Sequence, residues 1–149
     1  MASASSPKMT YTHLDVLLAS PTEPLVERKR VRQLTRMFEG LHSLEKLPNP
    51  TPDDWECVSD AVMLMQALRD MNVVQDPEGA IEDAFDALGR AGYRSMSGGA
   101  LRLDGPAINL LRGILEDYAS VLEQIPARTM ITAHRKAEKR VAEILKGKK

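Results

Sequence analysis

The chain has 149 residues, of which 43% are hydrophobic and 28% are charged, and its formal net charge is −1. These values are typical of one globular domain that can bury its own core. The single cysteine, Cys57, excludes an intrachain disulfide, and no apolar run approaches the roughly 20 residues that a membrane span requires. Because no secretory signal is visible either, we expect a cytoplasmic protein without a membrane role.

Aromatic residues make up only 4% of the chain, so leucine, isoleucine, valine, methionine and alanine must build the core. Such a composition favours helices over β-sandwiches and barrels. We therefore expect an all-α protein, and the start and stop signals along the chain agree with this expectation.

Small polar residues open the chain, and residues 1–10 are expected to form a disordered tail. A single helical domain should cover residues 11–149. A short helical turn can begin near Thr12 and carry several leucines before Pro21 interrupts it.

The first long helix is predicted from about Pro24 to Leu47. Apolar residues recur there at helical spacing, and Gly40 is a tolerable interruption. The predicted inner stripe runs through Leu34, Phe38, Leu41 and either Leu44 or Glu45, and continues backward through Val31 and Glu27.

The second helix has the strongest start signal in the chain. Thr51 can cap it, Pro52 suits the first helical position, and the acidic residues that follow face the positive end of the helix dipole. This helix is expected to end near Val74. Asp76-Pro77-Glu78 repeats the start chemistry for a third helix, and Gly92 can stop it.

The last third of the chain begins with a flexible connection at residues 93–100. Asp104-Gly105-Pro106 then opens a fourth helix. Pro126 leaves two alternatives open, because it can start a fifth helix or kink one long helix that reaches Leu145. The predicted fold is therefore an all-α bundle of four or five helices. Its core should include Leu34, Phe38, Trp55, Val62, Leu68, Phe85, Leu88, Leu111, Leu115, Tyr118 and Leu122.

No residue pattern indicates a defined chemistry. His13, His42 and His134 lack the spacing of metal ligands. Cys57 has no evident catalytic partner and is expected to be a small core residue. Ser97-Gly98-Gly99 lacks the lysine of a phosphate-binding loop. We therefore expect no catalytic residue, no metal and no cofactor, and we predict that the protein is not an enzyme.

Charge is unevenly distributed along the chain. Residues 51–92 hold two basic and ten acidic side chains, a net charge of −8, whereas residues 126–149 hold eight basic and two acidic ones, a net charge of +6. A concentrated negative surface suits docking to a basic protein, because complementary charge accelerates encounter. The candidate partner-binding residues are Asp53, Asp54, Glu56, Asp60, Glu82, Asp83 and Asp86. The alternative is that the basic end pairs with the acidic middle, within one chain or between subunits.

Two basic stretches support a second hypothesis, in which the protein contacts nucleic acid. In the first stretch, arginines recur every four residues and so form one stripe on a helix. Phosphate groups would attract such side chains, although no aromatic residues interleave with them for stacking on single strands. The candidate nucleic-acid-binding residues are Arg28, Arg32, Arg36, Arg128, Arg135, Lys136, Lys139 and Arg140.

Several stretches carry a resemblance to a known group of proteins. They are Leu34-Thr35-Arg36-Met37-Phe38-Glu39-Gly40-Leu41, Pro50-Thr51-Pro52-Asp53-Asp54-Trp55 with Val58-Ser59-Asp60-Ala61, Arg102-Leu103-Asp104-Gly105, and Leu115-Glu116-Asp117-Tyr118. With them the chain resembles small uncharacterised helical proteins that temperate phages and prophages of proteobacteria encode. The resemblance implies a cytoplasmic accessory protein that acts by binding, such as a regulator or inhibitor of a host system.

The leading functional prediction is thus a protein-binding module, and the alternative is a nucleic-acid-binding accessory protein. We also expect a homodimer, because nothing follows the last helix that could cover a wide apolar face. That face carries Met130, Ile131, Val141 and Leu145. The alternative is that it packs on the first long helix.

Overall fold

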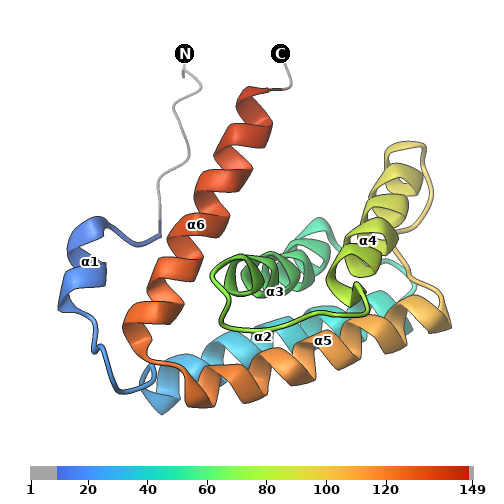
Figure 1. The fold of residues 1–149 in the computed structure, drawn as a ribbon. Helices are drawn as coiled ribbons and strands as arrows, with labels where there is room; N and C mark the ends of the chain where they lie inside the picture. Colours follow the sequence, from blue (N-terminus) through green and yellow to red (C-terminus); the bar gives the residue numbers. More distant parts are fainter. Residues whose placement is uncertain (1–9, 148–149) are drawn as a thin grey trace.

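The computed structural model describes residues 10–147 and shows an all-helical bundle (Figure 1). Helices account for 74% of these residues, and no strand occurs among them. The prediction of an all-α bundle is therefore confirmed. The tail predicted at residues 1–10 lies outside the described residues except for Thr10, whose backbone N–H donates a 2.7 Å hydrogen bond to Glu138 Oε2.

Six helices follow one another between residues 10 and 147. They are α1 (His13–Leu18), α2 (Glu27–Lys46), α3 (Pro52–Asp70), α4 (Ala80–Met96), α5 (Gly105–Gln124) and α6 (Ala127–Lys146). Five of them are long, which agrees with the larger of the two predicted numbers, and α1 is the short turn expected near Thr12. In this part of the chain no helix combines the length and the apolar character needed to cross a membrane.

Pro126 separates two helices and does not kink a single one. It occupies the N-cap position of α6 in an extended conformation, with φ −62° and ψ 150°. The preceding helix closes with a hydrogen bond from the Ile125 N–H to the Val121 carbonyl. As a result α6 turns away from α5 and passes α3 on the side opposite α4 (Figure 1).

Local capping explains where the helices begin. Thr51 and Asp54 form a reciprocal capping box at α3, with hydrogen bonds of 3.2 and 2.9 Å. The helix start predicted at Asp76-Pro77-Glu78 differs in detail. Helix α4 begins at Ala80, directly after Gly79, which has a left-handed φ of 73°. The Asp76 carboxylate still serves this helix, since it accepts hydrogen bonds from the first backbone N–H groups.

Two predicted helix ends are wrong by a few residues. α3 ends at Asp70, before the predicted Val74, and Asn72 adopts a left-handed φ of 62° just beyond it. α4 continues past Gly92 to Met96, and the left-handed glycine that follows it is Gly98, with φ 93°. Gly92 instead lies within the helix against the Trp55 ring, 3.5 Å from where a Cβ would stand.

The core lies around α3, which packs against α2, α4, α5 and α6. Seven of the eleven predicted core residues are buried, and the other four are only partly buried. The buried ones are Val62, Leu68, Leu88, Leu111, Leu115, Tyr118 and Leu122, and the partly buried ones are Leu34, Phe38, Trp55 and Phe85.

The predicted inner stripe of α2 is correct at Leu41 and Leu44, whereas Val31 is exposed and Leu34 and Phe38 are only partly buried. The buried face runs through Met37, Gly40, Leu41 and Leu44, whereas Phe38 lines a shallow groove on the outside together with Leu34 and Val31. The reason lies in α3, because a Cβ atom at position 40 would stand 2.8 Å from the Asp54 carbonyl oxygen. Helices α2 and α3 therefore meet along the line of α2 that contains Gly40. The larger side chains of α2 lie beside this line.

Trp55 is half-buried, and its indole has a polar partner within the protein. Its Nε1–H donates a 3.0 Å hydrogen bond to the Leu88 carbonyl, which ties α3 to α4. Phe85 lies at the edge of α4, whose buried line runs through Ala84, Leu88 and Ala91.

The apolar face of α6 is largely covered within the chain. Met130 and Ile131 are buried, and the helix packs on α3 and α1. Only the C-terminal end of this face stays open, where Ile144 and Leu145 are more than half exposed, at 52% and 56%. Dimerisation through α6 remains a prediction.

Candidate functional site

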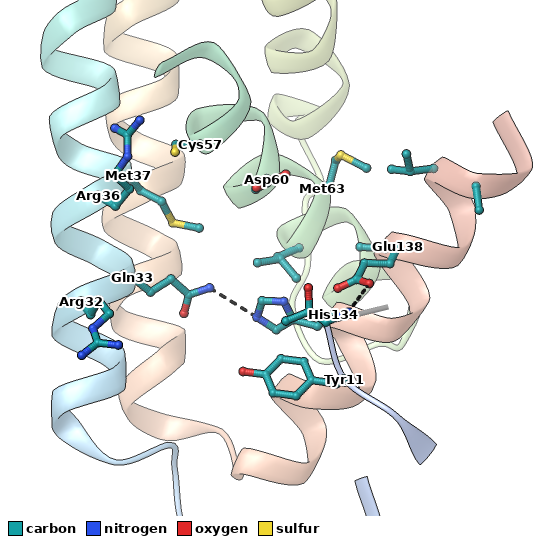
Figure 2. Close-up of a pocket in the computed structure, with 15 residues that line it drawn as sticks. Tyr11, Arg32, Gln33, Arg36, Met37, Cys57, Asp60, Met63, His134 and Glu138 are labelled. Carbon is teal, nitrogen blue, oxygen red and sulfur yellow. Dashed lines mark hydrogen bonds between the residues drawn. The ribbon is translucent and has the colours of Figure 1, made fainter. Parts of the chain in front are cut away.

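A pocket of about 560 Å³ lies between α2, α3 and α6, beside the segment that leads into α1 (Figure 2). Both α2 and α6 pack on α3, and the pocket occupies space left between them. Its size falls in the range usual for ligand sites. The apolar part of its wall comes from Met37 on α2, Met63 and Leu64 on α3, and Val141 and Ala142 on α6.

Polar side chains from three segments meet at one end of this pocket. Gln33 Nε2 and His134 Nε2 lie 3.3 Å apart, within hydrogen-bond distance. The rings of Tyr11 and His134 pack edge to face, with centroids 5.2 Å apart. The hydroxyl of Tyr118 is buried and makes no hydrogen bond of normal geometry among residues 10–147; burial, followed by Tyr11, raises the pKa of this phenol, and the nearby Gln33 amide acts in the opposite direction. The chain therefore leaves hydrogen-bonding capacity unused near the pocket.

His134 is the most buried ionisable group on the pocket wall. Burial lowers its pKa to about 4, although the neighbouring Glu138 acts in the opposite direction. The imidazole is therefore neutral at pH 7, with one nitrogen as donor and the other as acceptor. The sequence indicates that His134 is buried only through its position on the apolar stripe of the last helix. It gives no sign that Gln33 or Tyr11 contacts this residue.

Asp60 stands at the rim of the pocket. Its side chain is exposed, and no hydrogen bond or ion pair holds its carboxylate among the described residues. Burial of the carboxyl group, together with the charges of Glu56 and Glu138, raises the pKa of Asp60 to about 6. Asp60 and Glu138 thus line the pocket with Glu56 nearby, and no cation is paired with Asp60 among the described residues.

Cys57 lies on the same wall, which corrects the prediction that it is a core residue. It is half-buried, and burial raises the pKa of its thiol. The reason is the register of α3, in which Cys57 and Asp60 face the pocket while Val58 and Val62 face the core. The thiol is therefore protonated near pH 7 and is a weak nucleophile.

The seven predicted partner-binding residues lie in two groups, one on α3 and one on α4. Some of them form ion pairs with other residues of the chain. Asp53, Glu56 and Asp60 follow each other at helical spacing on α3 and are exposed beside the pocket. Asp83 and Asp86 are exposed on α4, which lies on the other side of α3 (Figure 1).

Asp54 and Glu82 are occupied by contacts within the chain. Asp54 caps α3 and forms a 3.4 Å ion pair with Arg36. Although burial opposes the effect, the hydrogen bonds from Thr51 and the contact with Arg36 lower the pKa of Asp54. Glu82 lies 3.1 Å from the Arg69 guanidinium. The sequence did not reveal these pairs because their members lie on different helices.

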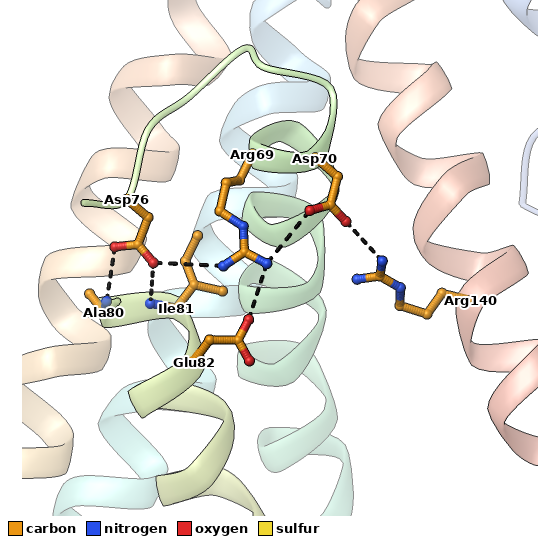
Figure 3. Close-up of polar contacts among 7 residues, drawn as sticks. All are labelled: Arg69, Asp70, Asp76, Ala80, Ile81, Glu82 and Arg140. Carbon is orange, nitrogen blue, oxygen red and sulfur yellow. Dashed lines mark hydrogen bonds and ion pairs between the residues drawn. The ribbon is translucent and has the colours of Figure 1, made fainter. Parts of the chain in front are cut away.

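Arg69 links the end of α3 to the start of α4 (Figure 3). Besides Glu82 it contacts Asp70 at 3.6 Å and Asp76 at 3.8 Å. Asp70 in turn forms a 2.8 Å ion pair with Arg140 of α6. The basic end of the chain therefore pairs with the acidic middle at this position, as the alternative interpretation of the charge pattern expected.

The eight predicted nucleic-acid-binding residues do not all remain available. Arg36 and Arg140 form the ion pairs described above, and Arg128 donates to the Val16 and Leu17 carbonyls at the end of α1. Arg28 and Arg32 are exposed on α2, Lys136 and Lys139 are exposed on α6, and Arg135 is half-buried. Arg32 and Arg36 also line the pocket on its α2 side.

No group of three histidine, cysteine or carboxylate side chains that could hold a metal ion occurs between residues 10 and 147. Comparison of the chain with protein-family models, curated proteins and solved structures finds no match.

Proposed function

We propose that this protein is a non-enzymatic binding module that docks another protein on α3 and the adjoining pocket. One observation carries the proposal: Asp60 belongs both to the pocket and to the acidic line of Asp53 and Glu56 on the exposed face of α3. A partner protein bound there would cover the apolar wall of the pocket and would contact the negative charges at its rim. An apolar centre with a polar rim is the usual composition of a protein interface.

The state of the titratable groups favours binding over catalysis. A nucleophilic cysteine needs a lowered pKa or a base in hydrogen-bond contact, and Cys57 has neither among the described residues. With a pKa of about 4, His134 is a poor general base near neutral pH. The resemblance to phage-encoded helical proteins extends the proposal to a cytoplasmic modulator of a host protein.

A site-specific cross-link tests the proposed surface. A photo-crosslinking residue in place of Glu56 is expected to capture one discrete protein in nuclease-treated native cell extract, because Glu56 lies beside the pocket. The same residue in place of Glu116, an exposed glutamate on α5, serves as the matched control and should capture none. Equal capture from both positions contradicts the proposal. A product that forms in untreated extract but not in nuclease-treated extract contradicts it as well.

The cationic end supplies a test of the nucleic-acid alternative. Replacing Lys139 and Arg140 by alanine is expected to lower stability by up to about 1 kcal/mol, because exposed ion pairs such as Arg140–Asp70 contribute little. Thermal unfolding and duplex-DNA binding at several salt concentrations measure both effects. If the two side chains contact phosphates instead, the slope of log affinity against log salt flattens by about two units with the melting temperature unchanged.

A further inference from the structure

The pocket carries opposite charges on different walls, and its two carboxylates lie together on the walls away from α2. Arg32 and Arg36 lie on the α2 side, whereas Asp60 and Glu138 come from α3 and α6 (Figure 2). Arg36 is paired with Asp54 at 3.4 Å, and Arg32 extends into solvent. Among residues 10–147, Asp60 has no cationic partner, and Glu138 accepts a hydrogen bond only from the Thr10 backbone N–H.

The wall between these charges suits an aliphatic chain. Met37 and Met63 face the pocket from opposite helices, and Val141 extends the apolar surface along α6. Methionine side chains adapt their shape to what they contact. Lysine and arginine place their methylene stems on such surfaces while keeping the charged group at a polar edge.

We infer that the pocket binds a lysine or arginine side chain of the partner protein, with its aliphatic stem against the methionines and its cation between Asp60 and Glu138. This inference rests on the proposed function and names the anchor that the docking surface would take. Cation and carboxylates would form charge-assisted hydrogen bonds in a partly desolvated site, where such bonds are strongest.

The charges around Asp60 give the interaction a defined pH dependence. Glu56 and Glu138 repel the Asp60 carboxylate, whereas Arg36, which is paired with Asp54, and the exposed Arg32 line the α2 side of the pocket. Because burial and the two glutamates raise the pKa of Asp60 to about 6, a proton competes with the cation below that pH. His134 is neutral between pH 5 and 7.5, since its pKa is about 4, and so does not alter the charge of the site in this range.

Three acetylated, amidated tripeptides test the inference on the full chain: Leu-Lys-Leu, Leu-norleucine-Leu and Leu-Glu-Leu. Norleucine keeps the aliphatic stem of lysine without its charge. At pH 7.5 the lysine peptide is expected to bind about tenfold more tightly than the norleucine peptide, and the glutamate peptide most weakly. Chemical shifts of the backbone amides around Asp60 and His134 report binding in the pocket. The preference for lysine should disappear between pH 7.5 and 5.

The variant Asp60→Asn separates the charge from the shape of the pocket. It is expected to bind lysine and norleucine peptides to within about twofold of each other, with norleucine binding unchanged. Asp53→Asn removes an equal charge from the same helix outside the pocket and should keep the tenfold preference. A fourth probe, n-hexylammonium, distinguishes a free amine from a side chain, and tighter binding of this amine than of the lysine peptide contradicts a protein source.

The outcomes distinguish this inference from the proposed function. Equal affinity for all three peptides, or no binding of any, overturns the lysine or arginine anchor even when the cross-link from position 56 succeeds. A lysine preference that Asp60→Asn abolishes supports the anchor. If the cross-link fails while this preference holds, the proposed docking surface is wrong although the pocket chemistry is as inferred.

Discussion

Replacing Gly40 by alanine is expected to destabilise the fold by about 2 kcal/mol, as measured by urea unfolding. The new Cβ would stand 2.8 Å from the Asp54 carbonyl oxygen and 3.5 Å from the Asp54 Cα. Both are backbone atoms of the first turn of α3, so α2 and α3 must move apart to make room. Overpacking against backbone atoms costs about 3 kcal/mol, the upper end of the usual range, and the roughly 1 kcal/mol that alanine gains in helix propensity reduces this loss to about 2 kcal/mol.

Two other helical glycines provide the control. Gly89 on α4 and Gly113 on α5 have no atom within 4 Å of the position of a Cβ. Alanine at either position should therefore stabilise the protein by about 0.5–1 kcal/mol through helix propensity alone. If Gly40→Ala has the same sign as these two substitutions, α2 and α3 do not approach each other as closely as described.

The same glycine shows which parts of the fold the sequence could predict. Helix starts are local, so Thr51 and Pro52 identified the beginning of α3 correctly. Gly40 was interpreted as an interruption, because the reason for it lies on a different helix. For the same reason the predicted stripe is correct at Leu41 and Leu44 but includes Leu34 and Phe38 in place of the buried Met37 and Gly40.

The candidate site could be predicted only in part. Counting charges identified the acidic region that contains Asp60, but it could not show that Arg36 neutralises Asp54 or that Arg69 contacts Glu82. These pairs depend on how α2, α3 and α4 pack. The pocket itself exists because α2 and α6 share α3 as a neighbour, and no short stretch of sequence encodes such an arrangement.

His134 gives the second large effect, a loss of stability in acid. Burial lowers its folded-state pKa to about 4 from its ordinary value of 6.5, so the folded protein binds this proton less well than the unfolded chain. The stability that this group confers is complete above pH 6.5 and is lost as the pH falls toward 4. A shift of this size corresponds to about 3 kcal/mol between pH 7 and 4.

Other groups titrate in the same range, so the effect must be measured as a difference between variants. Asp60 acts in the opposite direction, because its raised pKa makes the folded state gain stability as the pH falls from about 6. Its contribution should be below about 1 kcal/mol, since its exposed edge is screened by solvent.

The variant His134→Gln cannot take up the proton and keeps an amide that can bond to Gln33. Its unfolding free energy, measured by urea titration at each pH, is expected to depend less on pH than that of the wild type by about 3 kcal/mol between pH 7 and 4. His42 is exposed on α2, and His42→Gln should retain the full pH dependence. If His134→Gln loses as much stability in acid as the wild type, the imidazole is not held neutral in the fold, and the polar end of the pocket is open to water.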